Sequence, residues 1–430
     1  MSGSKNSQGI KVLVAGSVLQ LFLGVIYVWS VFVVPVQKFF NWEINNVKFT
    51  SNIMLCCFVI GILIAGRLQA KVKASFIVLA GGLMMAVGMF ATSVLPASAP
   101  FWSIWLTYGI IGGLGVGLAY NTIISCAQKW FPKKRGLATG ISVFAFGFSS
   151  VIFAPLIEEL VNPEAKTVFS NIINFESIGL DMTLKILAGA FTIATLALFW
   201  LIKLPENTAG APVDFGAQKQ YTTGEMLKTV DFYLIVFSQM FLTAAFFIIN
   251  PSLKLLAPMH GLDASFGITL VMIAGLANSA GRLVVPLLGE KIGKRGAVLT
   301  ILLITSIGTA SLCFAQGAFF VIAIAAVAFC YGGSSGVYPL VTSEHFGLKN
   351  IGSNYGMVMV GFMMSVLVAP NTVKQLFTGD KVPAAGNSSA VKYVMADNVW
   401  KFIALACVAA VGALLILVLI FRAKKANETK

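Results

Sequence analysis

Charged residues are scarce in this sequence, and acidic residues are the scarcest. Lysine, arginine, aspartate and glutamate make up 11% of the 430 residues, with 16 acids against 30 bases, whereas 58% of the residues are apolar. The mean hydropathy is +0.89. Soluble globular domains carry about 25% charged residues. The composition therefore excludes a soluble globular protein and indicates a polytopic membrane protein.

The sequence also lacks the motifs of common enzymes and pumps. It has no G-x-x-x-x-G-K-[ST] nucleotide loop, no H-E-x-x-H motif, no Cys/His cluster with metal spacing and no pair of membrane-embedded carboxylates. The six cysteines all fall within apolar segments, which is typical of small buried hydrophobic residues rather than of disulfides or metal ligands. We therefore expect no enzymatic activity, no catalytic residues, no metal and no cofactor, and ATP-driven transport is disfavoured.

Long apolar runs are what the sequence has in abundance. Runs of about 20 apolar residues predict membrane-spanning helices, and we count twelve, at residues 12–36, 47–69, 74–95, 101–128, 137–157, 183–203, 232–256, 265–288, 296–316, 318–343, 352–376 and 399–421. An even number of spans places both termini on the same side of the membrane. The expected fold is all-α.

The basic residues gather on one side of this predicted topology. The termini and even-numbered loops hold 20 lysines and arginines, whereas the odd-numbered loops hold 9. By the positive-inside rule, both termini are expected in the cytoplasm and the chain in the cell (inner) membrane as a multi-pass protein. The net charge of +14 is thus explained by topology, and we expect the lipid bilayer rather than a nucleic acid as the partner.

The chain divides into two similar halves. A polar connection rich in Pro, Gly and Thr at residues 204–230 separates six spans in residues 1–203 from six in residues 231–430. The sequence LQAKV at 68–72, after span two, recurs as LGEKI at 288–292, after span eight. These features predict two pseudo-symmetric six-helix bundles joined by a cytoplasmic linker, an arrangement typical of secondary transporters.

One cation is predicted at membrane depth. Arg282 lies inside the apolar run 265–288, and Asn278 lies four residues before it, so a helix would present both side chains on one face. A guanidinium in hydrocarbon costs about 2.5 to 3.5 kcal/mol on insertion scales, so such residues usually mark ligand sites. An Arg fork matches a carboxylate. We expect Arg282 to bind a small substrate carboxylate; the alternative is an arginine that holds two helices together.

Polar aromatic residues within the spans are further candidates for the substrate site. For each of them the alternative is ordinary core packing or a position in the interfacial aromatic belt. The candidates are Tyr27 and Trp29 in span one, Tyr120 in span four, and Tyr331 and Tyr338 in span ten.

Several motifs together resemble the oxalate/formate antiporter and monocarboxylate transporter group of the major facilitator superfamily (MFS). They are GVIYVWS at 24–30, KWFPKKRGLATG at 129–140, GRL at 281–283 with KIG at 291–293, GG at 332–333, FG at 346–347 and NYG at 354–356. The resemblance covers essentially the full length and is greatest to bacterial pyruvate- and lactate-type members. It implies the MFS fold, alternating access, and substrate binding by Arg282 with Tyr120 and Asn278.

Two departures from the resembled patterns bear on the substrate. Oxalate antiporters carry a lysine six residues after the NYG motif, where this chain has Phe362, so the resemblance favours a monocarboxylate such as pyruvate, lactate or formate. Proton-coupled animal members have Asp where this chain has Asn278, which does not titrate. A proton or a counter-anion as the co-substrate, an oxalate:formate-type exchange, and a transporter-like carboxylate sensor remain alternatives. We expect the chain to act as a monomer.

Overall fold

The computed structural model describes residues 2–162, 177–205, 218–250, 253–263, 266–377 and 388–428. Within these ranges every regular element is a helix and no β-strand occurs. A helix satisfies all of its interior backbone hydrogen bonds within one segment, which is what an apolar run needs in a bilayer. The predicted all-α fold is confirmed.

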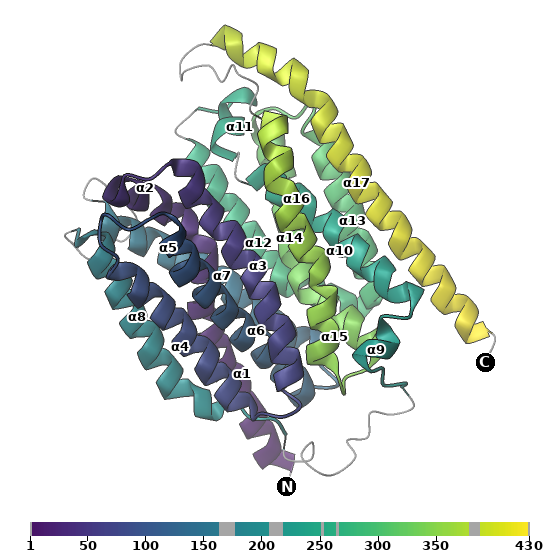
Figure 1. Ribbon diagram of the computed structural model, residues 1–430. Coiled ribbons are helices and arrows are strands. Elements are labelled where there is room, and N and C mark those ends of the chain that lie inside the picture. Colours follow the sequence, from purple (N-terminus) through teal and green to yellow (C-terminus); the bar gives the residue numbers. More distant parts are fainter. Residues whose placement is uncertain are drawn as a thin grey trace. The chain divides into compact units, whose positions relative to one another are not determined.

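The first of two compact units comprises Met1–Thr223 together with Phe346–Met357. Figure 1 shows its long helices, coloured purple to teal, packed side by side as a bundle. The elements of its main part are α1 (Ser2–Leu23), the 3-10 segment η1 (Gly24–Val28), α2 (Trp29–Phe40), α3 (Ile44–Leu68), α4 (Ala74–Ser93), α5 (Trp102–Ile104), the π-helical segment η2 (Trp105–Gly112), α6 (Gly113–Trp130), α7 (Arg135–Val161), α8 (Gly179–Leu198) and the 3-10 segment η3 (Phe199–Leu201).

The second unit comprises Gly224–His345 and Val358–Lys430. The helices from the unit boundary onward are α9 (Thr223–Met226), α10 (Val230–Ile249), α11 (Leu253–Met259), α12 (Phe266–Ile292), α13 (Lys294–Ser311), α14 (Gly317–Phe346), α15 (Ile351–Val358), α16 (Val360–Phe377) and α17 (Ser388–Glu428). Most of α15 therefore belongs to the first unit. The domain boundaries predicted at 203 and 231 stay a prediction.

Eleven helical stretches of the described residues are long and apolar enough to cross a membrane. Each matches one of the twelve predicted spans. The remaining predicted span, 296–316, coincides with α13, which begins with Lys294 and Arg295 and is therefore less apolar on average. The predicted span 232–256 is divided, because α10 ends at Ile249 and α11 is a separate short helix.

Close contact between α3 and α6 holds the first unit together. A side chain at Gly113 would collide with the carbonyl oxygen of Met54, and one at Gly117 with the carbonyl oxygen of Phe58. Only glycine lets the two backbones come this near. The two glycines are spaced by four residues, so both lie on the face of α6 that meets α3.

Buried hydrogen bonds attach α15 to the first unit. The side-chain amide of Asn121 on α6 donates to the carbonyl oxygen of Ile62 on α3 at 2.8 Å and to that of Gly352 on α15 at 3.0 Å. The Ser353 hydroxyl donates to the carbonyl oxygen of Gly66 at 2.7 Å. The Gly66 carbonyl group lies in the last turn of α3, where no intrahelical donor is available. The three bonds together fix the start of α15 in place.

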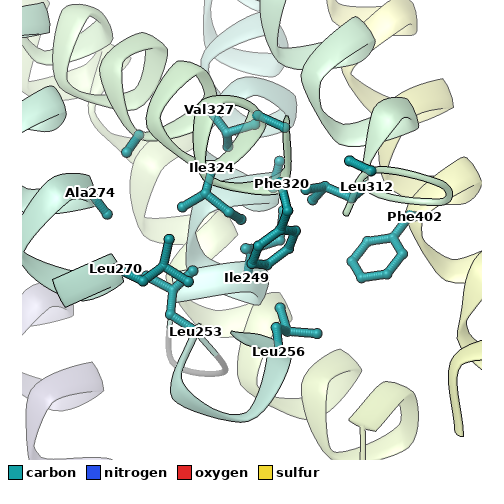
Figure 2. Packing of buried hydrophobic residues seen from close by; sticks show 14 of the residues in the cluster. Ile249, Leu253, Leu256, Leu270, Ala274, Leu312, Phe320, Ile324, Val327 and Phe402 are labelled. Carbon is teal, nitrogen blue, oxygen red and sulfur yellow. The ribbon is translucent and has the colours of Figure 1, made fainter. Parts of the chain in front are cut away.

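An apolar cluster surrounds α11 in the second unit (Figure 2). It draws side chains from five helices and the turn before α14, and its largest members include Ile249, Leu253, Leu256, Leu270, Phe320 and Phe402. Figure 2 shows Leu253 and Leu256 below Ile249, with Phe320 and Phe402 beside them. The cluster anchors the short helix α11, which could not fold alone at this length.

His260, directly after α11, is buried against this cluster. Its ring stacks on Phe320 with a centroid distance of 3.9 Å, and its Nδ1 lies 2.8 Å from the carbonyl oxygen of Ala315. Because a carbonyl only accepts, the neutral ring carries its hydrogen on Nδ1. Its Nε2 is buried and has no hydrogen bond within the described residues. Burial therefore lowers the pKa of His260.

Acid is expected to destabilise the second unit through His260. The pKa of His260 in the folded protein lies below the ordinary value of about 6.5, so the unfolded chain binds a proton at a higher pH than the folded protein does. The folded state is therefore most favoured above about pH 6.5, and its stability falls as the pH drops below that value. Between about pH 7.5 and pH 5.5 the ordinary pKa of histidine limits this loss to at most about 1.4 kcal/mol, or about 3 to 5 °C in melting temperature. Thermal unfolding of the purified protein in detergent measures it.

His260→Gln provides the matched comparison, because glutamine does not titrate and can still donate to the Ala315 carbonyl oxygen. We expect the variant to lose less melting temperature on acidification than the wild type. Equal losses in the two proteins would show that another group is responsible.

Candidate functional site

Arg282 lies in the middle of α12, surrounded in sequence by apolar residues. Its side chain is 0% exposed, and its Nε donates to Asn278 Oδ1 at 3.1 Å. The spacing of four residues places the two side chains on one helix face, as predicted. The amide oxygen thus fixes the orientation of the guanidinium plane.

The stretch of α12 around Arg282 packs directly on the backbone of α14. A side chain at Gly281 would collide with the carbonyl oxygen of Phe329, and a side chain at Gly332 with the carbonyl oxygen of Asn278. Two glycines, one from each helix, therefore let the backbones touch. This contact places Tyr331, the neighbour of Gly332, close to the segment that carries Asn278 and Arg282.

Aromatic rings from three helices of the second unit gather at Tyr331. The Tyr331 ring is buried and stacks face to face on Phe246 of α10, with a centroid distance of 3.8 Å and an interplanar angle of 6°. Phe247 meets Tyr331 edge to face at 5.5 Å and Phe362 of α16 at 5.2 Å. The structure thus brings two candidates, Tyr331 and Phe362, into one aromatic cluster.

A second aromatic cluster lies inside the first unit. Tyr120 of α6 is 2% exposed and packs on Phe58 of α3 at 5.1 Å and on Phe146 of α7 at 4.8 Å. Tyr27 of η1 is half-buried and meets Phe146 edge to face at 5.5 Å. The candidates Tyr27 and Tyr120 therefore share one neighbour, Phe146.

Trp29 and Tyr338 make hydrogen bonds and ring contacts within their own units. The Trp29 indole nitrogen donates to the carbonyl oxygen of Val47 at 2.9 Å, and its ring packs on Tyr108 at 4.6 Å. The Tyr338 hydroxyl lies 2.9 Å from Ser238 Oγ, where it links α14 to α10. These contacts match the packing alternative, and a role for either residue in substrate binding stays a prediction.

Charged side chains of the second unit meet where α10 and α13 begin and α14 ends. Glu344 pairs with Lys294 at 2.7 Å and with Arg295 at 3.4 Å. Asp231 bonds Arg422 of α17 at 2.9 Å and lies 3.3 Å from His345 Nε2. Within the described residues no group of three His, Cys, Asp or Glu is arranged to hold a metal ion.

The family model that matches this sequence is that of the Major Facilitator Superfamily, and it covers residues 14–370. The chain belongs to this superfamily. The fold agrees: the solved structure of the MFS transporter FucP in its outward conformation superposes with a TM-score of 0.65 at 15% sequence identity, covering 94% of this chain and 99% of FucP. An MFS transporter is a membrane protein that moves small molecules.

Among MFS relatives, this transporter is similar to members of the oxalate/formate antiporter and monocarboxylate transporter group. It is 28% identical to the uncharacterized MFS-type transporter YhjX of Escherichia coli, over 81% of this chain and 84% of YhjX. It is 27% identical to the oxalate:formate antiporter of Oxalobacter formigenes, over 64% of this chain and 62% of the antiporter. Rat monocarboxylate transporter 13 is 30% identical over 33% of this chain and 32% of its own length.

Sequence reasoning missed the phenylalanines that complete the two aromatic clusters. Phe58, Phe146, Phe246 and Phe247 are found only through their contacts with the predicted tyrosines. The chain has 34 phenylalanines, so an apolar ring in an apolar span carries no signal of its own. The adjacent pair Phe246-Phe247 in the middle of span seven is the one local pattern that could have suggested a ring cluster.

Proposed function

We propose that this MFS transporter carries small monocarboxylates of the pyruvate, lactate and formate class by alternating access, with Arg282 binding the substrate carboxylate. The observation that carries the proposal is the fully buried guanidinium of Arg282, which is held by Asn278 and is the only charge within residues 269–289 of α12. A cation at such a place is rarely kept for packing alone, because its transfer from water is unfavourable. The names of the oxalate:formate antiporter and of monocarboxylate transporter 13 support a carboxylate substrate.

The side chains near Arg282 fit a small anion with an apolar tail. A guanidinium fork binds the two oxygens of one carboxylate in parallel hydrogen bonds. The stacked rings of Phe246 and Tyr331 present apolar surface on the neighbouring helices. Phe362, in the same cluster, supplies no second cation for a second carboxylate. These features favour one carboxylate over two.

Uptake into proteoliposomes tests the proposal. We expect accumulation of radiolabelled pyruvate, lactate or formate, inhibited by other short carboxylates and not by a neutral ester such as methyl pyruvate. Because the sequence matches an oxalate:formate antiporter, oxalate uptake against internal formate is the second arm. Binding without uptake would indicate a sensor, and inhibition by neutral esters alone would contradict the carboxylate site.

The orientation, the oligomeric state and the coupling complete the proposal. We place the protein in the cell membrane with both termini in the cytoplasm. The uneven distribution of basic residues between the loops supports this orientation. A monomer is sufficient, because Arg282 and Asn278 come from one chain. A pH gradient imposed across the proteoliposomes distinguishes proton symport from exchange with a counter-anion.

Asn278→Asp is expected to make substrate binding dependent on pH. An aspartate at this position would pair with Arg282 as a carboxylate and compete with the substrate. We expect the KM for pyruvate to rise about tenfold at neutral pH, which corresponds to about 1.4 kcal/mol, and to recover as the aspartate is protonated. Initial uptake rates measured over a pH series give the KM values.

Asn278→Ser serves as the comparison, because serine leaves no titratable group beside Arg282. We expect its KM to follow the same pH profile as the wild type. If the KM of Asn278→Asp also follows the pH profile of the wild type, the introduced carboxylate does not contact the groups that bind the substrate.

A further inference from the structure

A groove of about 330 Å³ lies in the first unit, between the start of α1 and the end of η3. Six of the residues that the structure describes line it: Ser7, Gln8, Lys11, Trp200, Leu201 and Lys203. Ser7 and Lys11 are four residues apart, so they lie on one face of α1. The lining thus combines two lysines, two side chains that can donate neutral hydrogen bonds, and an apolar wall.

Among the residues that the structure describes, the charged side chains that line this groove are both lysines, Lys11 and Lys203. The three stretches of chain that form and flank it, residues 1–42, 129–157 and 182–205, contain no aspartate or glutamate. Gly9 of α1 lies against the rings of Trp130 and Phe131, and the basic residues 133–135 follow shortly after them in the sequence. The Trp130 indole nitrogen donates to the carbonyl oxygen of Lys203 at 2.7 Å and so fixes the backbone of that lysine.

The apolar side of the groove continues along surfaces that face lipid. On α1, Ile10 and Val14 are 54% and 57% exposed, and on α8, Ile193 is 71% exposed. Trp200, which lines the groove, is 54% exposed at the end of the same apolar stretch. Exposed apolar side chains on a membrane helix contact acyl chains, and tryptophan is typical of the headgroup level. The groove therefore lies at the level of lipid headgroups.

We propose that this groove binds one anionic phospholipid. Lys11 and Lys203 hold the headgroup phosphate, Ser7 and Gln8 donate hydrogen bonds to its oxygens, and the acyl chains begin at Leu201 and Trp200 and follow the exposed faces of α1 and α8. A zwitterionic headgroup fits less well, because its ammonium group would meet two lysines and, among the described lining residues, no carboxylate. The groove thus selects phosphatidylglycerol-like lipids over phosphatidylcholine by charge.

Native mass spectrometry of the delipidated full-length protein tests the proposal. Phosphatidylglycerol and phosphatidylcholine with identical acyl chains are titrated separately and in competition. We expect the wild type to prefer phosphatidylglycerol, and the double variant Lys11→Gln/Lys203→Gln to bind it roughly thirtyfold more weakly, since each lysine near a phosphate contributes about a factor of five. Lys11→Arg/Lys203→Arg should keep the preference.

Lys71→Gln/Lys73→Gln is the matched control, because both lysines are exposed in the turn between α3 and α4 and do not line the groove. It removes the same charge and should bind lipid as the wild type does. Equal loss in both double variants would overturn the assignment to this groove. A wild type with no preference between the two lipids would overturn the proposal without any variant.

A soluble anion is the competing occupant. Millimolar inorganic phosphate, added to the same titration, is expected to leave phosphatidylglycerol binding unchanged, because free phosphate makes no contact with the apolar wall. Displacement of the lipid by phosphate would show a soluble-anion site and overturn the proposal. The melting temperature of each variant, measured in the same detergent, confirms that the compared proteins are folded.

Discussion

Replacing Arg282 with glutamine is expected to lower carboxylate uptake by roughly a hundredfold or more. The side chain is fully buried in α12, and its charge is the only one between residues 269 and 289. Removing one partner of a desolvated, hydrogen-bonded charge pair costs about 2 to 5 kcal/mol, which is about thirtyfold to several thousandfold in affinity. Glutamine keeps a similar length and a donor but loses the charge. Initial rates of pyruvate uptake into proteoliposomes measure the effect.

Arg422→Gln is the matched control, because it makes the same change in the same unit. Arg422 is half-exposed and pairs with Asp231 at the end of α17, where a surface ion pair contributes little. We expect near-normal uptake from this variant. If Arg282→Gln also transports normally while its melting temperature is unchanged, Arg282 has a structural role and the carboxylate site must be sought elsewhere.

Gly332→Val is expected to cause the largest loss of stability of any substitution considered. A side chain at this position would collide with the carbonyl oxygen of Asn278, so α14 and α12 would have to move apart. Overpacking of a close contact costs about 1 to 3 kcal/mol, which corresponds to several degrees in melting temperature. Because the displaced segment carries Asn278, we also expect uptake to fall. Thermal unfolding and uptake measured on the same preparation check both effects.

Gly189→Val is the control for the effect of placing a valine in a helix without a packing conflict. Gly189 lies on α8, and a side chain there would meet no atom within 4 Å. The helix-forming cost of valine is similar at both positions, so any difference comes from packing. A melting temperature of Gly332→Val equal to that of Gly189→Val would mean that the α12–α14 contact is loose enough to adapt.

The apolar runs were enough to predict the helices, and the single charge within one of them was enough to select Arg282 as a candidate site residue. Long hydrophobic segments must become helices in lipid, and a lone arginine within one is conspicuous against that background. The pairing of Arg282 with Asn278 followed from helical spacing alone. The substrate-binding role assigned to both residues stays a prediction.

The roles of the tyrosines and of Trp29 could not be predicted, because they depend on which helix lies beside which. Tyr331 and Tyr338 are on the same helix, yet one stacks on Phe246 and the other bonds Ser238. Both partners lie on α10, which is distant in sequence. The same limit applies to Asn121, whose amide donates to two backbone carbonyl groups on other helices.

Phe346–Met357 belongs to the first unit but is synthesised late, which affects when that unit can finish folding. Domains of a growing chain usually begin to fold from the N-terminal end as they emerge. Here the first unit lacks its last helical turns until residues 224–345 have left the ribosome. Until then Gly352 has not been synthesised, so the hydrogen bond from the Asn121 amide to its carbonyl oxygen cannot form. Translation therefore completes the first half of this transporter only after most of the second half has been threaded into the membrane.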